Sequence, residues 1–441
     1  MREVVKGKNA DPSHGWRHRF KTVGIWIKGA GLLDWGVRKP VLVLVSILFC
    51  SALAFAAKYL DEGGMLEWDP IEDRIGSDQR TVWLATRADR QRSDIALVTI
   101  GEDSLRDYPF ISPISRTLLA ALVCEIDAVA PKALGLDVII EPPSPGDDDL
   151  IRAISIAKHP IVLGGIDDRY ARSNPDEAAL TQEGILFQEN FARASGVSIG
   201  HIWLEHKTGF FHKDDETVRY VAASNVGHPS RESFSYVLAK AAGYDHRPIS
   251  RIIAWLRPPQ DQTTPLFPQL TVPRHKPDDL ARGRKLFSSA ELELLKGRIV
   301  LVGATMSDRD RHKTPLSVRD GRRAPGVAIH AQVVAQIIDE RDITETTNWA
   351  KLLLYFLTSA ACLALSTFYK IHAHHEIGAV AVALFGLALF WGFSIDIPVG
   401  PLIFVGMVSV FVVPCMKFIK ARYVELSELL RRWNSWGAEG R

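Results

Sequence analysis

The chain has 441 residues, of which 47% are hydrophobic and 24% charged, and its formal net charge is +2. This length leaves room for two or three domains, and the near-neutral charge gives no argument for nucleic-acid binding. The apolar residues are concentrated in one block near the start and three near the end, namely Val41–Ala57, Leu352–Phe368, Ile377–Ile395 and Leu402–Met416. A long, more polar segment separates the first block from the other three.

Each apolar block approaches the length of a transmembrane helix. Val41–Ala57 contains no ionisable residue and lies at the lower end of the roughly 17–25 residues that a spanning helix needs. The last block is short, but the Pro-Gly stretch Ile397–Pro401 before it can lie in the headgroup region. The pattern predicts one transmembrane helix at 41–57 and three more within 351–416. Ion-coupled transport is disfavoured, since no block contains an ionisable residue at membrane depth.

Lysine and arginine near the blocks predict their orientation. Nine basic residues against three acids lie in segment 1–40, and six against three lie in segment 417–441. Both termini are therefore expected in the cytoplasm and segment 58–350 outside it. In an alternative interpretation, Ala54-Phe55-Ala56 is a signal-peptidase site, although the preceding polar region of about forty residues is much longer than usual.

Segment 58–350 alternates between strand and helix patterns. Strands are predicted at Ile95–Ile100, Ala133–Ile140, Ile161–Gly164, Arg251–Leu256 and Ile299–Val302, with further extended segments in Ser198–Tyr220 around a turn at Lys213–Glu216. Helices are predicted at Arg116–Asp127, Asp149–Ala157, Ser233–Ala242 and Val327–Asp339. Pro258–Lys285, rich in proline and charge, is expected to be an irregular insertion. The alternation predicts an α/β extracytoplasmic domain with a mixed, mainly parallel sheet.

Three carboxylates, Asp103, Asp137 and Glu141, lie at or just beyond the carboxyl ends of predicted strands. The carboxyl ends of parallel strands line the ligand crevice of an open α/β sheet, and Arg116 and Thr305 are expected at the same rim. One interpretation is a polar small-ligand pocket or a cation site. In the structural alternative, Asp137 caps a loop and pairs with Arg116. In an enzyme, the three carboxylates would supply acid and base, but no nucleophile–base pair stands out in the sequence.

Two histidines flank a Thr-Pro loop after the last strand. His312 and His330, with Asp308 and Asp310 nearby, are residue types that bind zinc, but their spacing matches no ligand signature. We therefore predict neither a metal nor a cofactor. A histidine in the first turns of a helix more often satisfies buried backbone groups, and its protonation would otherwise make the domain a pH sensor.

Several short motifs in segment 58–350 resemble the second type of CHASE domain, an extracellular sensory domain of bacterial cyclases and histidine kinases. The motifs are Asp73-Arg74, Ile100–Ser104, Arg116, Leu136–Glu141, Asp149-Leu150, Asp215 with Arg219, Val302–Thr305, Asp310, Thr314-Pro315, Gly326-Val327 and Ile329–Ala331. The resemblance covers roughly Asp69 to Arg341 and the three following apolar blocks. Tyr108–Ser115 departs from it, because the family usually has a Trp-Pro pair there.

The resemblance implies a sensor in the inner membrane of a bacterium, working as a dimer in many related architectures. The residues at which a ligand is expected are Asp103, Arg116, Asp137, Glu141, Thr305, Asp310, Thr314 and His330. Family members precede a kinase or cyclase, whereas neither flank of this sequence has room for one. We therefore expect a non-catalytic receptor or regulatory subunit that signals to a separate protein.

The cytoplasmic segment 417–441 offers a means of contacting such a protein. Tyr423, Leu426, Leu429, Leu430 and Trp433 recur at helical spacing among charges. The pattern indicates a docking helix or an amphipathic helix on the inner leaflet. A structural subunit that assembles other membrane proteins is the alternative function, because small residues in the later apolar blocks allow close helix contacts.

Overall fold

The structure is a computed structural model of the whole chain, and it describes residues 40–62, 78–167, 169, 178–206, 217–221, 231–248, 251–259, 264–306, 310–317, 321–368, 384–386, 388–389, 391–399, 401–411 and 422–429. Two compact units are distinguished, one formed by Met1–Leu66, Thr347–Leu384 and Pro398–Arg441 and the other by Glu67–Thr346 and Phe385–Ile397. Some sequence predictions fall partly or wholly outside the described residues, among them Asp73-Arg74, Asp308, the turn at Lys213–Glu216 with Asp215, segment 1–40, the apolar blocks Ile377–Ile395 and Leu402–Met416, and Leu430 and Trp433.

The second unit is built on a six-stranded sheet whose neighbouring strands all run parallel, in the order β4-β3-β2-β8-β1-β7. Its strands are β1 (Ile95–Ile100), β2 (Ala133–Asp137), β3 (Ile161–Gly165), β4 (Ser198–His201), β7 (Gln269–Thr271) and β8 (Ile299–Ala304). Every residue of β1 is buried, as expected of a parallel strand covered on both faces. The prediction of an α/β domain with a mainly parallel sheet is confirmed.

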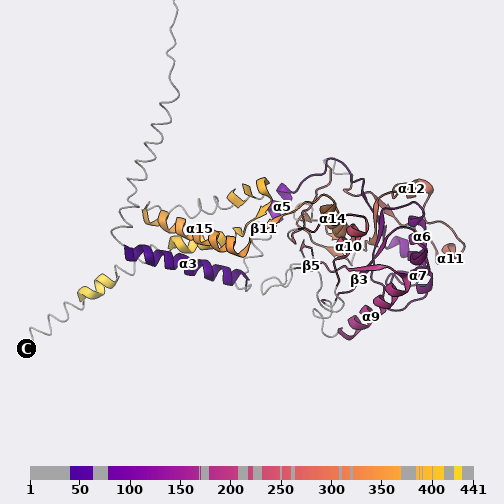
Figure 1. Cartoon of the computed structure of the whole chain (residues 1–441), viewed down its shortest axis with the longest axis horizontal. Helices are drawn as coiled ribbons and strands as arrows, with labels where there is room; N and C mark the ends of the chain where they lie inside the picture. Colours follow the sequence, from indigo (N-terminus) through magenta and orange to yellow (C-terminus); the bar gives the residue numbers. More distant parts are fainter. Residues whose placement is uncertain are drawn as a thin grey trace, which may run out of the picture. The chain divides into compact units, whose positions relative to one another are not determined.

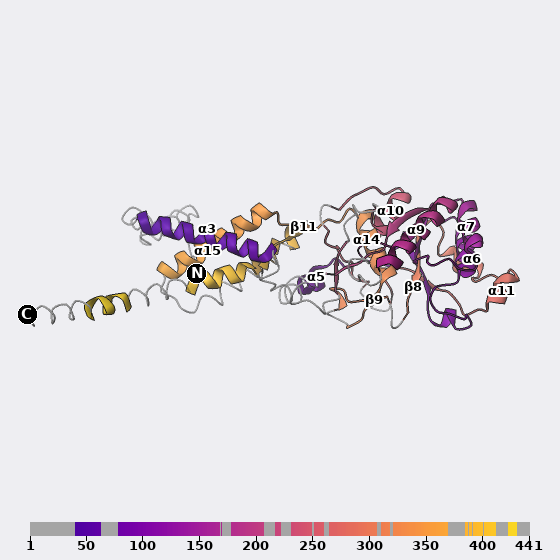
Figure 2. The same ribbon diagram turned by 90° about the horizontal axis from the view of Figure 1, so that it is seen from below.

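Helices cover both faces of this sheet. The described α-helices of the unit include α5 (Asp78–Leu84), α6 (Arg116–Asp127), α7 (Asp147–Ile156), α9 (Ala178–Ser195), α10 (Phe234–Ala241), α11 (Pro277–Ala281), α12 (Ser289–Glu293) and α14 (Gly326–Ile338). One apolar core joins α6 and α7 to the sheet, and a second joins α10 and α14 to its other face. Figures 1 and 2 show the two helix pairs on opposite sides of the strands.

Glycines in two strands allow α10 to lie close to the sheet. A Cβ atom on Gly135 would be 2.6 Å from Cδ2 of Leu238, and one on Gly200 would be 2.5 Å from Cα of Phe234. Both distances are shorter than van der Waals contact. Any larger residue at either position would therefore push α10 away from β2 or β4.

The predicted strand at Arg251–Leu256 was wrong. This segment contains only an isolated bridge at Ile252. Its backbone bonds instead to glutamine side chains of α14, since the N–H groups of Ala254 and Leu256 donate to Gln336 and Gln332 at 2.9 and 3.0 Å. Side chains of a helix thus accept from two of its N–H groups, while Ile253 N–H donates to the carbonyl of Arg219 in the short strand that ends at Tyr220, at 2.9 Å.

The predicted irregular insertion at Pro258–Lys285 was also wrong in part. It contains β7, which pairs with β1 at the edge of the sheet, and α11. Only the middle residue of β7, Leu270, is buried. Three residues with one buried side chain give too little periodicity for a sequence pattern to reveal a strand. Helix α9 was likewise not predicted.

Short two-stranded pairs complete the second unit. They are β5 (Glu205–His206) with β6 (Val218–Tyr220), β9 (Arg311–His312) with β10 (Ala324–Pro325), and β11 (Thr344–Glu345) with β12 (Ile395–Asp396). The last pair joins the residues that follow α14 to the segment near 394. It therefore ties together two parts of the chain about fifty residues apart in sequence.

The described residues of the first unit are mainly helical. Helix α3 (Pro40–Glu62) and helix α15 (Asn348–Phe368) lie side by side in both views (Figures 1 and 2). Residues 401–411 and 422–429 are also helical. Among the helices that the structure describes, none combines the length and the apolar character needed to cross a membrane. The four transmembrane helices therefore stay a prediction.

Candidate functional site

The connections that follow β8 and its two neighbouring strands leave the sheet toward opposite faces. After β1 and β2 the chain passes to the face covered by α6 and α7, whereas after β8 it passes to the opposite face and enters α14. β8 lies between β1 and β2. Connections that leave neighbouring strands in opposite directions open a crevice at the carboxyl ends of those strands, where ligands bind in open α/β sheets. The candidate site is therefore the rim formed by the ends of β1, β8 and β2.

Two titratable side chains meet at this rim. Asp137 is the last residue of β2, and its carboxylate Oδ1 lies 3.9 Å from Nε2 of His330 on α14, with both side chains about 5% exposed. Gly303 of β8 allows α14 to come this close, because a Cβ there would lie 2.6 Å from that of Val327. The Val-Gly-Ala-Thr motif thus positions the helix that carries the histidine.

Burial shifts both groups toward their neutral forms. It raises the pKa of Asp137 well above the usual 3.8, and the negative charge of Asp310 raises that pKa further. Burial lowers the pKa of His330 to about 3, and nearby His201 and His312 contribute to that lowering. In the described part of the chain no hydrogen bond reaches the Asp137 carboxyl group. At neutral pH the rim therefore presents an uncharged imidazole beside a carboxyl group that resists ionisation.

Asp310 lies at the start of α14. Its backbone carbonyl accepts a hydrogen bond from Gly326 N–H at 3.3 Å, and its carboxylate lies 3.3 Å from His312 Nε2. A Cβ on Gly326 would be 2.7 Å from Asp310 Oδ1, so the glycine leaves room for the carboxylate at the first residue of the helix. An anionic group at this end is favoured by the helix dipole. Asp310 thus contributes negative charge to the rim from the β8–α14 loop.

Three residues that the sequence reasoning missed extend the site toward β3 and β4. Ser235 Oγ lies 2.9 Å from Nδ1 of His330. His201, the last residue of β4, lies 4.0 Å from Asp167, which follows β3, and both side chains are buried. The same rule that selected Asp137, a polar residue at the carboxyl end of a strand, identifies His201 and Asp167 once β3 and β4 are known to be neighbours.

Arg116 is buried, but its partner is not the one considered in the structural alternative. Its guanidinium donates to Asp147 at 3.0 Å and to the carbonyl groups of Ile114 and Pro142 at 3.2 and 3.3 Å. Asp147 in turn accepts a hydrogen bond from Ser144 N–H. The predicted pairing of Arg116 with Asp137 was therefore wrong, and this arginine fixes the loop between β2 and α7.

Glu141 and Thr305 lie at different parts of the rim. Glu141 packs against α9, since a Cβ on Gly184 would be 1.8 Å from its Oε2, and burial raises the pKa of its carboxyl group. Thr305 is half-buried just beyond β8, and its N–H donates to the carbonyl of Ile100 at 3.0 Å. Thr305 therefore bridges the ends of β8 and β1, and Glu141 faces the side covered by α9.

The remaining two predicted residues take no part in the Asp137–His330 contact. Asp103 is 69% exposed and pairs with Arg106 at 3.3 Å. Thr314 is buried and begins a turn, where its N–H donates to Ser317 Oγ at 3.0 Å. The carboxylates of Asp103, Asp137 and Glu141 thus have separate surroundings, and the structure does not bring them together as the acid and base of one catalytic site. Within the described residues, no group of three or more potential metal ligands is present.

The sheet and its two helix layers define a three-layer α/β domain, with buried polar side chains at the carboxyl ends of its strands. The family model of the CHASE2 domain matches residues 45–366 of the chain. The chain belongs to this family of second-type CHASE sensory domains. The match begins before the predicted Asp69 and ends within the first of the three apolar blocks included in the prediction, so it covers most of α3 and α15. No curated protein and no solved structure matches the chain.

Proposed function

We propose that the chain is a non-catalytic receptor of a bacterial inner membrane, with its α/β domain outside and both termini in the cytoplasm. A ligand or envelope partner binds the outer domain, and the change passes through the predicted transmembrane helices to a separate signalling protein. The family match supports the sensory role. The apolar sequences of α3 and α15 and the basic residues of the flanks support the membrane orientation.

The path of α14 is the observation that carries this proposal. The helix begins at the rim, where Gly326 meets Asp310 and His330 meets Asp137. It ends at Ile338, and α15 begins only ten residues later at Asn348. A ligand that moves the first turns of α14 thus acts on a stiff, buried helix whose other end is close in sequence to α15. This arrangement suits a receptor that transmits a shift.

Residues 422–429 support a separate partner. They form a helix in which Tyr423, Leu426 and Leu429 are 71, 58 and 61% exposed. Apolar side chains at this spacing form one face of a helix, as in the helix-in-groove mode of binding. We propose this face as the contact with the cytoplasmic partner.

The proposal is tested by purifying the full-length protein in a mild detergent and identifying the retained proteins by mass spectrometry. We expect a stoichiometric kinase or cyclase. Its activity should change in Asp137→Asn and His330→Gln variants and stay at the wild-type level in Asp103→Asn, whose side chain is exposed. A catalytic partner that responds equally to all three variants would contradict the role of the rim.

A structural subunit of a membrane complex is the second candidate, and helix packing in the first unit favours it. Ser359 and Ser409 are buried and share a hydrogen bond of 2.8 Å, and a Cβ on Gly406 would be 3.3 Å from Sγ of Cys362. Such close contacts through small residues are typical of helix assembly in membranes. A stoichiometric partner without a catalytic domain would favour this function over sensing.

A further inference from the structure

The second unit contains a cavity at the opposite end of the sheet from Asp137. Its volume is about 580 Å³, and it is lined by α5, by the segments around 85–87, 254–257 and 341–343, and by Trp391 and Ser394. Arg341 follows the end of α14, where Asp339 pairs with Arg92 at 2.6 Å just before β1. The cavity therefore lies near the amino ends of the strands, away from the rim described above.

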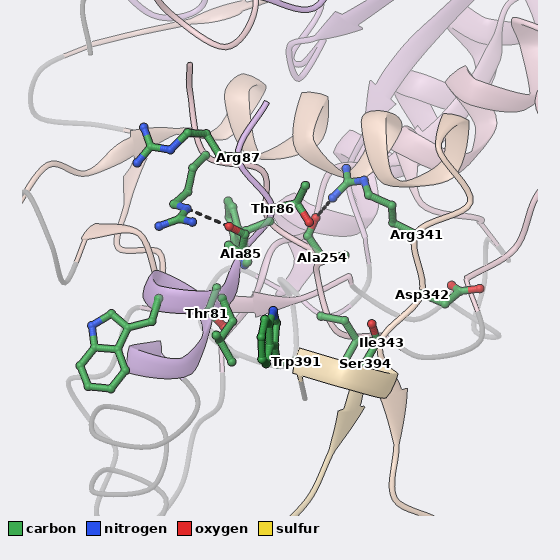
Figure 3. Close-up of a pocket in the computed structure, with 14 residues that line it drawn as sticks. Thr81, Ala85, Thr86, Arg87, Ala254, Arg341, Asp342, Ile343, Trp391 and Ser394 are labelled. Carbon is green, nitrogen blue, oxygen red and sulfur yellow. Dashed lines mark hydrogen bonds between the residues drawn. The ribbon is translucent and has the colours of Figure 1, made fainter. Parts of the chain in front are cut away.

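Positive charge predominates in the lining. It includes Arg87, Arg257 and Arg341 against one acid, Asp342, and the carboxylate of Asp342 already lies 3.1 Å from His246 Nε2. Figure 3 shows Arg87 and Arg341 on either side of Thr86 and Ala254. Two arginines thus reach the cavity from different segments of the chain. Their charge exceeds what the lining acid balances.

The guanidinium of Arg341 has a donor that is not used. Nε donates to Asp339 at 2.9 Å, and Nη1 donates to the carbonyl of Ala254. Nη2 is buried and, among the described residues, has no hydrogen-bond partner. A buried donor without an acceptor is costly. An oxyanion in the cavity would supply the missing acceptor.

Tryptophans form the apolar part of the lining. Trp255 is 5% exposed, whereas Trp83 and Trp391 are 62 and 79% exposed. Trp391 lies in Figure 3 between Thr81 and the pair Ile343 and Ser394. Aromatic surface beside arginine donors favours a ligand that carries both an apolar body and an anionic group.

We propose that this cavity binds a small molecule that carries a phosphate or carboxylate group on an apolar body, with Arg341 and Arg87 holding the anion and Trp391 contacting the apolar part. The anion is supplied either by a soluble compound or by the headgroup of an anionic phospholipid. The arginines recognise the same oxyanion chemistry in both cases.

The position of the cavity gives this binding a regulatory consequence, which rests on the proposed receptor function. Arg341, Asp342 and Ile343 join α14 to β11, and Thr344 N–H donates to the carbonyl of Ser394 at 2.8 Å. A ligand held by Arg341 and Trp391 contacts residues next to both strands of the β11–β12 pair. Its binding therefore stabilises the connection that leads from α14 to α15.

The test uses the full-length protein in detergent, with phenyl phosphate as the soluble probe and phenol as its neutral counterpart. Phenyl phosphate should raise the melting temperature, and phenol should not. Arg341→Gln and Arg87→Gln should each weaken binding at least about tenfold, the effect of losing one charge-assisted hydrogen bond. Arg152→Gln is the matched control, because Arg152 is 71% exposed on α7.

Nanodiscs distinguish the two sources of the anion. If phosphatidylglycerol raises the melting temperature relative to phosphatidylcholine, and Arg341→Gln and Arg87→Gln remove that difference, the ligand is a lipid headgroup. The proposal is overturned if neither probe stabilises the protein, or if stabilisation persists in Arg87→Gln. Arg87 makes no ion pair within the described residues, so its variant should fold even if Arg341→Gln does not. A partner that still co-purifies would show that the receptor function stands without this site.

Discussion

Two buried ionisable residues near the carboxyl end of β2 differ in their partners. Arg116 is fully buried, but it has a carboxylate and two carbonyl groups within hydrogen-bonding distance. Asp137 is nearly as buried, yet within the described residues no hydrogen bond reaches its carboxyl group, and the neutral imidazole of His330 lies 3.9 Å away. A buried charge that is fully paired fixes a structure, whereas an unpaired one costs stability and is retained where a ligand or a switch needs it. The partners of Arg116 therefore indicate a structural role, and the lack of them at Asp137 indicates a functional one.

The largest effect is expected from Arg116→Gln. Removing one partner of a buried ion pair leaves Asp147 without its counter-charge, and we expect a loss of about 3–5 kcal/mol in the free energy of unfolding. Denaturant unfolding of the full-length protein measures it. Arg152→Gln removes an exposed arginine 3.7 Å from Asp149 and should change stability by less than about 0.5 kcal/mol. Equal effects of the two substitutions would mean that the buried pair of Arg116 contributes no more to stability than an exposed ion pair.

The buried imidazole of His330 should make the stability of the protein depend on pH. The pKa of His330 is about 3 in the folded protein and near 6.5 when unfolded. Between these values the unfolded chain binds a proton that the folded protein does not, so stability falls as the pH drops from about 6.5 toward 3. His330→Gln should reduce this loss by a few kcal/mol near pH 4, since each pKa unit corresponds to about 1.4 kcal/mol.

Unfolding curves at several pH values between 4 and 7 measure this slope. Asp103→Asn is the control, and it should keep the acid-side loss of the wild type near pH 4 to 6. If His330→Gln and the wild type lose stability in parallel, the histidine is not buried in its neutral form.

The sequence predicted the alternating elements that carry the rim more reliably than the contacts across it. β1 and α6 were predicted with their observed bounds, because apolar periodicity over six and twelve residues is unambiguous. The carboxyl-end rule placed Asp137 correctly. It could not show that β8 lies between β1 and β2, because strand order depends on contacts between segments about two hundred residues apart.

Contacts between helices that no local pattern reveals explain the errors in the candidate site. One of the two interpretations of the rim pairs Arg116 with Asp137, whereas its carboxylate partner Asp147 begins α7 and lies 31 residues away. Ser235 was not selected because it lies on the predicted helix at Ser233–Ala242 with no motif, and only the packing of α10 against α14 brings its hydroxyl to His330. Long-range packing, rather than local propensity, determines these contacts.

The effect of pH on stability that we expect from Asp137 has the opposite sign to that from His330. Burial raises the pKa of Asp137, so the unfolded chain loses its proton first as the pH rises above about 4, and the folded state loses stability relative to it. Asp137→Asn removes the ionisable group without changing its shape. We expect the variant to gain about 1 kcal/mol at pH 7 and nothing below pH 4. A loss of stability at pH 7 would instead mean that Asp137 is an ion paired in the folded protein.

The smallest effect is expected at Asp103. It follows β1 as Asp137 ends β2, but its side chain is 69% exposed and its partner Arg106 is 64% exposed at 3.3 Å. Such surface pairs contribute about 0–1 kcal/mol and are screened by salt, so Asp103→Asn should change stability by less than about 0.5 kcal/mol at any pH between 4 and 7. Unfolding at low and high salt measures it. A larger, pH-dependent change would place Asp103 in the same electrostatic environment as Asp137.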